Sequence, residues 1–227
     1  MLKETADGSH TLFLPGWDEH YHSLHGAIRE SLHIFINEGF DRVAGGFVEG
    51  ERGAGKSLMV LEVGFGTGLN ALLTVERAMD LGVNVNYLAL EPYPLTAAEV
   101  SRLNLPDKVA GGLLADDFFR MHNAHFGEMT NVRQGFIFGK WKFRLQDAPL
   151  PPCVYHLVYH DAFAPQVQPE LWGAEVFGKL HRAMVPGGVL TTYSAKGSVK
   201  RALRACGFSL SHPAGPPGKR EMTRASR

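Results

Sequence analysis

The stretch that decides the fold of this chain is Leu61-Glu62-Val63-Gly64-Phe65-Gly66-Thr67-Gly68-Leu69-Asn70. An apolar run that starts at Leu58 leads into three glycines at alternate positions, and a helix-compatible segment, 70–73, follows at once. A strand, a glycine turn and a helix in this order let a nucleotide-like cofactor lie against bare backbone at a helix N-terminus. An ordinary glycine-rich strand-to-helix turn is the alternative.

The spacing of the glycines indicates which cofactor to expect. Dinucleotide-binding chains usually read G-x-G-x-x-G, whereas this chain reads E-x-G-x-G-x-G. An acidic residue before the first glycine can bind the cation of an amino acid, and it would repel a pyrophosphate. We therefore expect S-adenosyl-L-methionine here. The expected contacts are Glu62, Gly64, Phe65, Gly66, Thr67, Gly68 and Asn70.

Length and composition exclude several classes of protein. The chain has 227 residues, with 44% hydrophobic and 20% charged, which is typical of one globular domain, with or without a small appendage. No apolar run approaches the roughly 18–20 residues that span a bilayer, and the N-terminus carries no signal-peptide pattern. Cys153 and Cys206 show no ligand spacing. We expect a cytoplasmic protein with no membrane partner.

The charge is distributed unevenly along the chain. Net charge is zero, but the segment 196–227 carries eight Lys or Arg against one acid, Glu221. A basic C-terminal end on an acidic body suits a polyanionic partner, with a solvated basic tail as the alternative.

Alternating strands and helices predict an α/β, Rossmann-like fold with a mostly parallel, doubly wound sheet. We expect residues 1–57 to form an N-terminal extension or lid and 58–227 to form the core, within one domain overall. In the extension, a helix from Gly26 to Asn37 should stop at Gly39. The expected strands are 58–63, 84–90, 142–145, 154–159 and 189–193, with a closing hairpin at 208–212 and 219–224. The expected helices are 69–80, 96–104, 171–184 and 198–205.

Acidic residues follow several of these strands, at the edge where such sheets bind ligands. Glu91 comes 23 residues after Gly68, about the interval at which a second-strand acid meets ribose hydroxyls, and Pro92 follows it. Asp147 is placed to accept from an adenine amino group. The alternative for both acids is a strand-end charge in solvent.

The segment His160-Asp161-Ala162-Phe163 follows another buried strand and is the candidate chemical centre. Methyl transfer from a cationic donor depends mainly on in-line positioning. An amine acceptor must nevertheless be neutral to attack and must then lose a proton, which Asp161 can take directly or through water. Phe163 can stack on a planar base. His160 fits a structural role better, and Asp161 capping the following turn is the alternative.

The N-terminal segment adds a candidate lid over the cofactor. Tyr21, Ser23 and Glu30 would reach over the cofactor from this side. Four histidines lie nearby, and they are His20, His22, His25 and His33. Their spacing matches no metal-binding pattern, so we expect no metal site.

Several blocks together resemble a known family, the MnmC-type methyltransferases that modify the wobble uridine of bacterial tRNA. The matching segments span about residues 10–225 in order. They are Tyr21-His22-Ser23 with Gly26 and Glu30, the glycine stretch 61–70, 90–95, Asp161-Ala162-Phe163-Ala164-Pro165, 169–172, Pro186-Gly187-Gly188, 194–201, and Gly218-Lys219-Arg220-Glu221-Met222.

The resemblance implies a class I methyltransferase fold with a seven-stranded sheet and a C-terminal antiparallel hairpin. It implies transfer of methyl from S-adenosyl-L-methionine to the amine of 5-aminomethyl-2-thiouridine, giving 5-methylaminomethyl-2-thiouridine, with Asp161 as the catalytic group. The anticodon loop of tRNA would be the partner. Its phosphates would be held by Lys196, Lys200, Arg201, Lys219 and Arg220. Some relatives carry a flavin-dependent oxidase, but this sequence has no second glycine-rich fingerprint, so we expect no flavin domain in this chain.

Other functions stay open, and one is a small-molecule or protein N-methyltransferase, although it would not explain the basic C-terminal end. A spermidine-synthase-like aminopropyltransferase has a similar sheet with an acid after the fourth strand, although its larger N-terminal β-domain and second acidic cluster are not visible here. A cofactor- or RNA-binding module without catalysis is the alternative from a different class, and the intact Asp161 argues against it.

Overall fold

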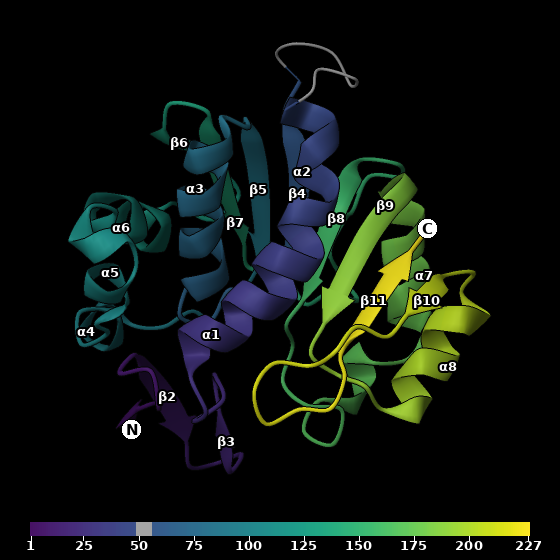
Figure 1. Ribbon diagram of the computed structural model, residues 1–227, viewed down its shortest axis with the longest axis horizontal. Coiled ribbons are helices and arrows are strands. Elements are labelled where there is room, and N and C mark those ends of the chain that lie inside the picture. The colour runs from purple at the N-terminus through teal and green to yellow at the C-terminus, as the bar shows by residue number, and fades with distance from the viewer. Residues whose placement is uncertain (49–55) are drawn as a thin grey trace.

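The computed structural model describes residues 1–48 and 56–227. A single twisted sheet of eight strands runs through the described part of the chain, in the order β10-β11-β9-β8-β4-β5-β7-β6 (Figure 1). Its central strands are parallel, while β6 and β11 pair antiparallel to their neighbours. The expected α/β fold with a mostly parallel sheet and a closing C-terminal hairpin is therefore confirmed, and β6 adds an eighth strand to the expected seven.

The parallel strands all end at one edge of the sheet. These strands are β4 (Leu58–Val63), β5 (Val85–Leu90), β7 (Phe136–Trp141), β8 (Tyr155–His160) and β9 (Met184–Thr192). Val63 of β4 is opposite Leu90 of β5 and His160 of β8. Because these three residues lie in register, the segments that follow them emerge side by side. The residues after each strand therefore meet at one place, although they are far apart in the sequence.

One prediction about the N-terminal helix is wrong. The helix does not stop at Gly39. It begins as α1 (Ala27–Ser31), passes through Gly39 in a π-helical stretch, η1 (Leu32–Phe40), and goes on as α2 (Asp41–Val48). A Cβ atom on Gly39 would lie 3.2 Å from the side chains of both Tyr159 and Thr191. The glycine thus allows the helix to pack closely on the sheet, and it does not end the helix.

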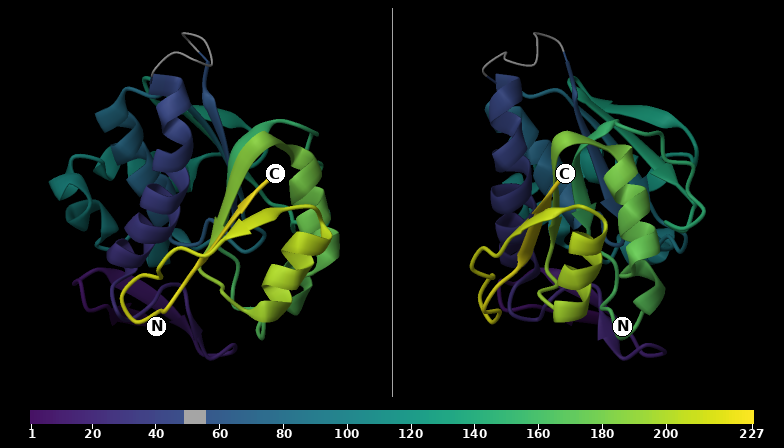
Figure 2. Two further views of the ribbon diagram at one scale, coloured as in Figure 1. Left: turned by 45° about the vertical axis from the view of Figure 1, so that its right-hand side comes forward. Right: turned by 90° about the vertical axis from the view of Figure 1, so that its right-hand side faces the viewer.

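The two faces of the sheet are covered by different helices (Figures 1 and 2). One face buries Ile34 and Phe40 of η1, Leu72 of α3 (Leu69–Leu81) and Phe118 of α6 (Ala115–Asn123). The other face packs against α7 (Ala174–Ala183) and α8 (Gly197–Ala205). Short helices α4 (Ala97–Val100) and α5 (Leu105–Lys108) and the 3₁₀ turns η2 (Ala110–Gly112) and η3 (Pro169–Leu171) complete the connections.

The third parallel strand also differs from the prediction. It is Phe136–Trp141, whereas the expected segment 142–145 has no regular structure up to the turn at 145. This strand forms a hairpin with β6 (Met129–Arg133). The strand contains Lys140, which is 3% exposed and donates through Nζ to the carbonyl of His122 at 2.6 Å. A buried lysine interrupts the apolar pattern by which a strand is recognised in sequence.

The first residues form a small sheet beneath the edge where the parallel strands end (Figure 1). It consists of β1 (Leu2–Glu4), β2 (His10–Leu14) and β3 (Glu19–His20). The C-terminal hairpin, β10 (Ser209–Ser211) and β11 (Thr223–Ser226), sends its connecting loop toward the same edge. Residues of η1 share one apolar core with β4, and the division at residue 57 stays a prediction. Within 1–48 and 56–227, no helix has the length and apolar character needed to cross a membrane.

Candidate active site

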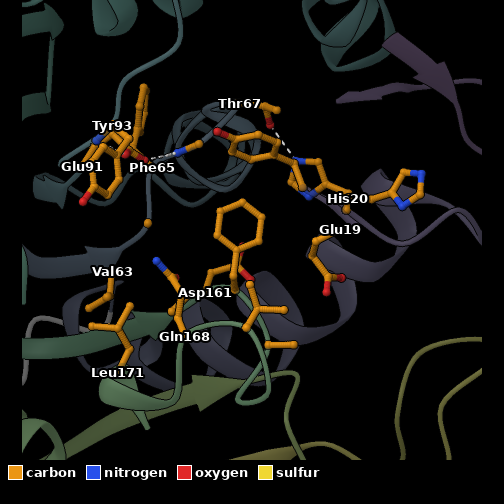
Figure 3. Close-up of a pocket in the computed structure, with 18 of the residues that line it drawn as sticks. Glu19, His20, Val63, Phe65, Thr67, Glu91, Tyr93, Asp161, Gln168 and Leu171 are labelled. Carbon is orange, nitrogen blue, oxygen red and sulfur yellow. Dashed lines mark hydrogen bonds between the residues drawn. The ribbon is translucent and has the colours of Figure 1, made fainter. Parts of the chain in front are cut away.

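A cavity of about 920 Å³ opens where the parallel strands end (Figure 3). Its walls come from the β2–β3 turn, the glycine loop, and the segments that follow β5, β7, β8 and β9. Most of the predicted site residues line it: Tyr21, Ser23, Glu30, Gly64, Phe65, Gly66, Thr67, Asn70, Glu91, Pro92, Asp161, Phe163 and Lys219. The others, which are not among the lining residues, are Glu62, Gly68, Asp147, Lys196, Lys200, Arg201 and Arg220.

The glycine loop needs its glycines because other backbone and side chains approach it closely. Gly64 has φ +92°, and a Cβ there would lie 2.7 Å from the carbonyl oxygen of Asp161. Gly66 has φ +51°, and a Cβ there would lie 2.9 Å from the ring of Tyr21. Both conformations are unfavourable for residues with side chains. The loop therefore presents bare backbone to the cavity, as expected for a site that holds a ligand against a helix N-terminus.

Asn70 joins two acidic residues at the cavity floor. Its Nδ2 donates to Oε1 of Glu62 at 3.0 Å and to Oδ2 of Asp161 at 2.8 Å. Its backbone carbonyl accepts a hydrogen bond from the Thr74 hydroxyl, one turn further along α3, at 2.6 Å. Glu62 is fully buried behind Asn70, so Asn70 is the residue of this pair that lines the cavity.

The two acids that Asn70 contacts have perturbed pKa values. Burial raises the pKa of Asp161 to about 7, against the opposing effect of the hydrogen bond from Asn70. Burial also raises the pKa of Glu62 well above its usual value. Asp161 is thus able to gain and lose a proton near neutral pH, which is the property of a general base.

Glu91 is held by the backbone on both of its oxygens. Oε2 accepts from the amide of Gly66 at 2.9 Å, and Oε1 accepts from the amide of Tyr93 at 2.8 Å. The residue is 7% exposed, and burial raises its pKa. A carboxylate oxygen has more than one acceptor position, so this fixed carboxylate retains capacity for the two hydroxyls of a ribose.

Beside the expected adenine contact Asp147, the residue that lines the cavity is Gln146, which the sequence did not single out. The Asp147 side chain is exposed, whereas its neighbour Gln146 lines the cavity. Oε1 of Gln146 is buried without a hydrogen-bond partner. A buried acceptor with no donor is costly, and an amino group of a bound purine would supply one. The sequence indicated this region, because Gln146 directly precedes Asp147, but not which side chain points inward.

Aromatic side chains gather at the mouth of the cavity. The ring of Phe163 contacts Trp17 with a centroid distance of 5.1 Å and Tyr21 with one of 5.2 Å, both edge to face. Trp17 is 44% exposed and was not singled out from the sequence. Its position in the β2–β3 turn, remote in sequence from Phe163, gave no signal of the contact.

The loop that carries Asp161 and Phe163 is fixed from behind. The carbonyl of Ala162 accepts from the Tyr193 hydroxyl at 2.8 Å, and the carbonyl of Phe163 accepts from Nε1 of Trp172 at 2.8 Å. His160 is fully buried, with Nε2 3.0 Å from the carbonyl oxygen of Leu171, and burial lowers its pKa to about 4. These contacts support a structural role for His160.

Two of the four N-terminal histidines make polar contacts with different segments of the chain. Nε2 of His22 lies 2.6 Å from the hydroxyl of Thr67, and Nε2 of His33 lies 2.7 Å from the carbonyl oxygen of Ala214. In the described residues, no group of three or more His, Cys, Asp or Glu side chains is arranged to hold a metal ion.

The basic residues of the C-terminal end occupy different surroundings. Lys219 lines the cavity and pairs with Glu30, and Lys200 pairs with Glu221 at 2.7 Å. Lys196 is exposed and donates to Gln166. Arg201 and Arg220 are also exposed. Of the five predicted phosphate contacts, three are therefore exposed and accessible to a large anion: Lys196, Arg201 and Arg220.

The cavity fits a nucleoside cofactor that carries an amino acid. Bare glycine backbone lies beside the fixed carboxylate of Glu91, as a ribose requires. Oδ1 of Asn70 and Oε1 of Gln146 are buried acceptors without a donor, and both residues line the cavity. An ammonium group and a purine amino group are donors of the kind that these atoms lack.

Comparison with known proteins agrees with this geometry. Residues 121–227 match the model of a family described as S-adenosyl-L-methionine-dependent methyltransferase. The chain is 28% identical to a Pseudomonas fluorescens protein over 92% of its own length and 32% of the relative's. It is 30% identical to a Ralstonia nicotianae protein over 95% of its length and 33% of the relative's. Both are named tRNA 5-methylaminomethyl-2-thiouridine biosynthesis bifunctional protein MnmC. The chain thus spans about a third of the length of these relatives.

A solved structure matches the whole fold. The crystal structure of MNMC2 from Aquifex aeolicus superimposes with a TM-score of 0.76, at 24% sequence identity, over 99% of this chain and 69% of that one. This similarity confirms the fold class expected from the sequence. The description of the family model agrees with S-adenosyl-L-methionine, the cofactor expected from the sequence.

Proposed function

We propose that this chain is an S-adenosyl-L-methionine-dependent methyltransferase that methylates the aminomethyl nitrogen of 5-aminomethyl-2-thiouridine at the wobble position of tRNA, and the family model that matches residues 121–227 supports this class. The product is 5-methylaminomethyl-2-thiouridine. The names of the relatives from Pseudomonas fluorescens and Ralstonia nicotianae, which concern this nucleoside, support the choice of substrate.

The observation that carries the proposal is the position of Asp161. It lines the cavity beside the aromatic ring of Phe163, and Asn70 holds its carboxylate. A planar base that stacks at the aromatic mouth would direct a short aminomethyl arm inward, toward this acid. The combination of a base-stacking mouth and an inner carboxylate is what an aminomethyl-nucleoside acceptor requires.

The residues of the chain have distinct tasks in this reaction. When bound, the cofactor supplies a methyl group on a positively charged sulfur, so the step depends mainly on alignment. Glu91 and the glycine loop hold the ribose, and Asn70 fixes the carboxylate of Asp161. The acceptor nitrogen gains one carbon and must release one proton, which Asp161 accepts. Because burial raises the pKa of Asp161 to about 7, this acid can accept the proton and return it to solvent near neutral pH.

The anticodon loop is a favourable target for such a cavity. Its wobble base is single-stranded, so presenting it to a pocket costs less than extruding a base from a duplex. The exposed side chains of Lys196, Arg201 and Arg220 would bind the backbone phosphates. We propose that the chain performs the methylation alone, on a 5-aminomethyl group that another enzyme has made.

The test is a nucleoside analysis. The protein is incubated with S-adenosyl-L-methionine and tRNA that carries 5-aminomethyl-2-thiouridine. The tRNA is then digested, and the masses of its nucleosides are measured by mass spectrometry. A gain of one methyl on the aminomethyl group is expected. In a parallel reaction with the decarboxylated cofactor and a polyamine acceptor, transfer of an aminopropyl group would favour the aminopropyltransferase alternative. Binding of tRNA and cofactor with no transfer would favour a non-catalytic module.

A further inference from the structure

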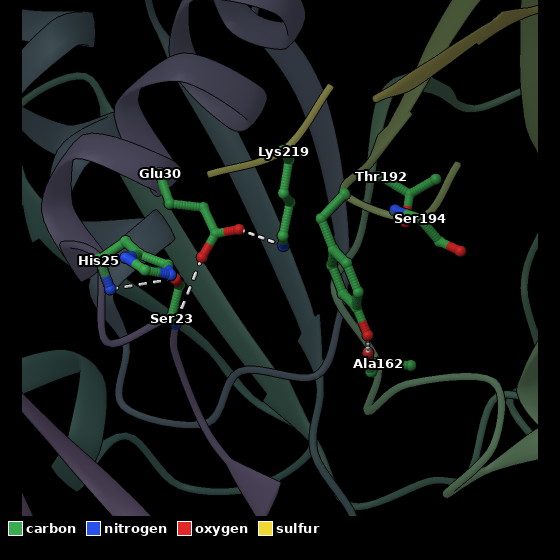
Figure 4. A network of polar contacts seen from close by, with 8 residues as sticks. Ser23, His25, Glu30, Ala162, Thr192, Ser194 and Lys219 are labelled. Carbon is green, nitrogen blue, oxygen red and sulfur yellow. Dashed lines mark hydrogen bonds and ion pairs between the residues drawn. The ribbon is translucent and has the colours of Figure 1, made fainter. Parts of the chain in front are cut away.

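Lys219 lies inside the candidate active site and not on the free surface. It belongs to the loop between β10 and β11, and it lines the same cavity as Asp161. Its ammonium forms an ion pair with the Glu30 carboxylate of α1 (Figure 4). The same ammonium stands 4.5 Å from the ring centroid of Tyr193. The side chain is therefore held between a carboxylate and an aromatic face.

The loop that carries Lys219 is tied down at several points. The amide of Gly215 donates to the carbonyl of Arg220 at 3.2 Å, which closes the loop on itself. His33 of η1 contacts the carbonyl oxygen of Ala214 at 2.7 Å. Lys200 of α8 pairs with Glu221 at 2.7 Å. These contacts fix the direction in which the Lys219 side chain points.

The charged groups around Lys219 come from several elements. The charges of Glu30 of α1 and of Lys219 act on Asp161, which follows β8. Glu30 raises the pKa of Asp161, and Lys219 lowers it. Glu19 of β3 and Tyr193 after β9 line the same wall, and the ring of His25 lies close to Gly218. Arg144, the other lysine or arginine among the described lining residues, contacts Tyr93 at 3.2 Å, beyond the end of β5. Of these two lining residues, Lys219 is thus the one whose positive charge lies at the Asp161 end of the cavity.

An alkyl amine is mostly protonated at neutral pH, with a reference pKa near 10.4 for a lysine side chain. A protonated amine has no lone pair and cannot accept a methyl group. Two carboxylates, Glu30 and Asp161, would by themselves favour the protonated form. The positive charge of Lys219 offsets that of Glu30, so the amine is less strongly driven to the protonated form than it would be beside both carboxylates alone.

We propose that Lys219 is a selectivity residue that makes the cavity take the acceptor amine in its uncharged form, an inference that rests on the proposed function. Glu30 holds the Lys219 ammonium in place, and Asp161 remains the group that accepts the proton after transfer. In this proposal Lys219 acts on the acceptor nitrogen, and the exposed basic residues bind the tRNA phosphates.

The test is the pH dependence of kcat with saturating cofactor and saturating tRNA that carries 5-aminomethyl-2-thiouridine, because kcat reports groups that titrate in the bound complex, such as the acceptor amine. Lys219→Met removes the cation, so the acidic limb is expected to move to higher pH by about one unit, a roughly tenfold loss of rate below the limb with little loss above it. Lys219→Arg keeps the charge and should restore the original limb. Glu30→Gln removes the opposing charge and should move the limb to lower pH.

Opposite shifts from Lys219→Met and Glu30→Gln separate an electrostatic role from a structural one. An equal loss of rate at all pH values in Lys219→Met would overturn the proposal. So would an unmoved limb with a smaller salt dependence of tRNA binding, because that result identifies a phosphate contact. Should Lys219→Met fail to fold, as judged by its thermal melt, Glu30→Gln with an unmoved limb would overturn the proposal by itself. No methylation by the unsubstituted protein would reject the proposed function and this inference together.

Discussion

The side-chain amide of Asn70 lies 2.8 Å from Oδ2 of Asp161 and donates a hydrogen bond to it. Asn70 lies in the first turn of α3, after the glycine loop, whereas Asp161 follows a strand 91 residues further along the chain. The same amide nitrogen also donates to Glu62 at 3.0 Å. This link fixes the orientation of the candidate base relative to the glycine loop, the expected cofactor site.

We expect Asp161→Asn to reduce kcat/KM by roughly 10²–10⁴-fold, the usual contribution of a positioned general base. The asparagine keeps an acceptor for Asn70 but cannot take a proton at neutral pH. Cofactor affinity, measured by calorimetry, should stay within about twofold, as expected when no polar contact to the ligand is lost. In the unsubstituted protein kcat/KM, which reports groups of the free enzyme, should rise with pH through about 7, as Asp161 loses its proton. Near-normal turnover in the variant would remove Asp161 from its assigned role.

Glu62→Gln should stabilise the protein, and increasingly so at higher pH. Burial raises the pKa of Glu62 well above its value in the unfolded chain. The folded state therefore holds a proton that the unfolded state has lost, and stability falls as pH rises from the unfolded pKa, about 4.3, toward the folded pKa. Glutamine carries no such cost. Thermal melts between pH 5 and 8 are the measurement, where 1 kcal/mol corresponds to about 2–4 °C. A variant that melts lower than the unsubstituted protein at pH 8 would contradict the argument.

Glu91→Gln should weaken cofactor binding by roughly tenfold to a hundredfold, because a charged acceptor of hydrogen bonds is lost. A matched control is Asp147→Asn, which neutralises an exposed acid after the next strand of the sheet. Calorimetry with S-adenosylhomocysteine compares the two variants. Equal effects of both substitutions would mean that the ribose does not lie on Glu91.

Replacing Lys196, Arg201 and Arg220 together by alanine should weaken tRNA binding and flatten its salt dependence. Each lost phosphate contact reduces the slope of log K against log salt by roughly 0.7 for single-stranded nucleic acid. The matched control replaces three exposed basic residues from other segments, Lys3, Lys56 and Arg102. Cofactor binding should be unchanged in both proteins. If the slope stays the same in the first variant, the phosphates lie elsewhere.

The parts of the site that follow from local pattern could be predicted from the sequence. The glycine loop is recognised by its spacing, and Glu91 and Asp161 by their positions just after buried strands. Parallel strands bring such residues together at one edge whatever the details of the loops. The fold class follows from the same alternation of strands and helices.

The remaining features depend on contacts between distant segments. Gly39 resembles a helix stop, but its task is close packing against Tyr159 and Thr191. Lys219 resembles a lysine of a basic tail, but it pairs with Glu30, 189 residues away. Gln146 and Asp147 are neighbours, and the turn between strands decides which of them faces the cavity. Such choices are made by tertiary packing and leave no periodic signal in the chain.

The most direct test of the account is a crystal structure of the protein with S-adenosylhomocysteine bound. We predict the ribose hydroxyls within hydrogen-bond distance of Glu91 and the sulfur atom facing the end of the cavity where Asp161 lies. A sulfur atom turned away from Asp161, or a ligand bound outside the glycine loop, would contradict the central claim that this cavity aligns a methyl donor with an amine beside that acid.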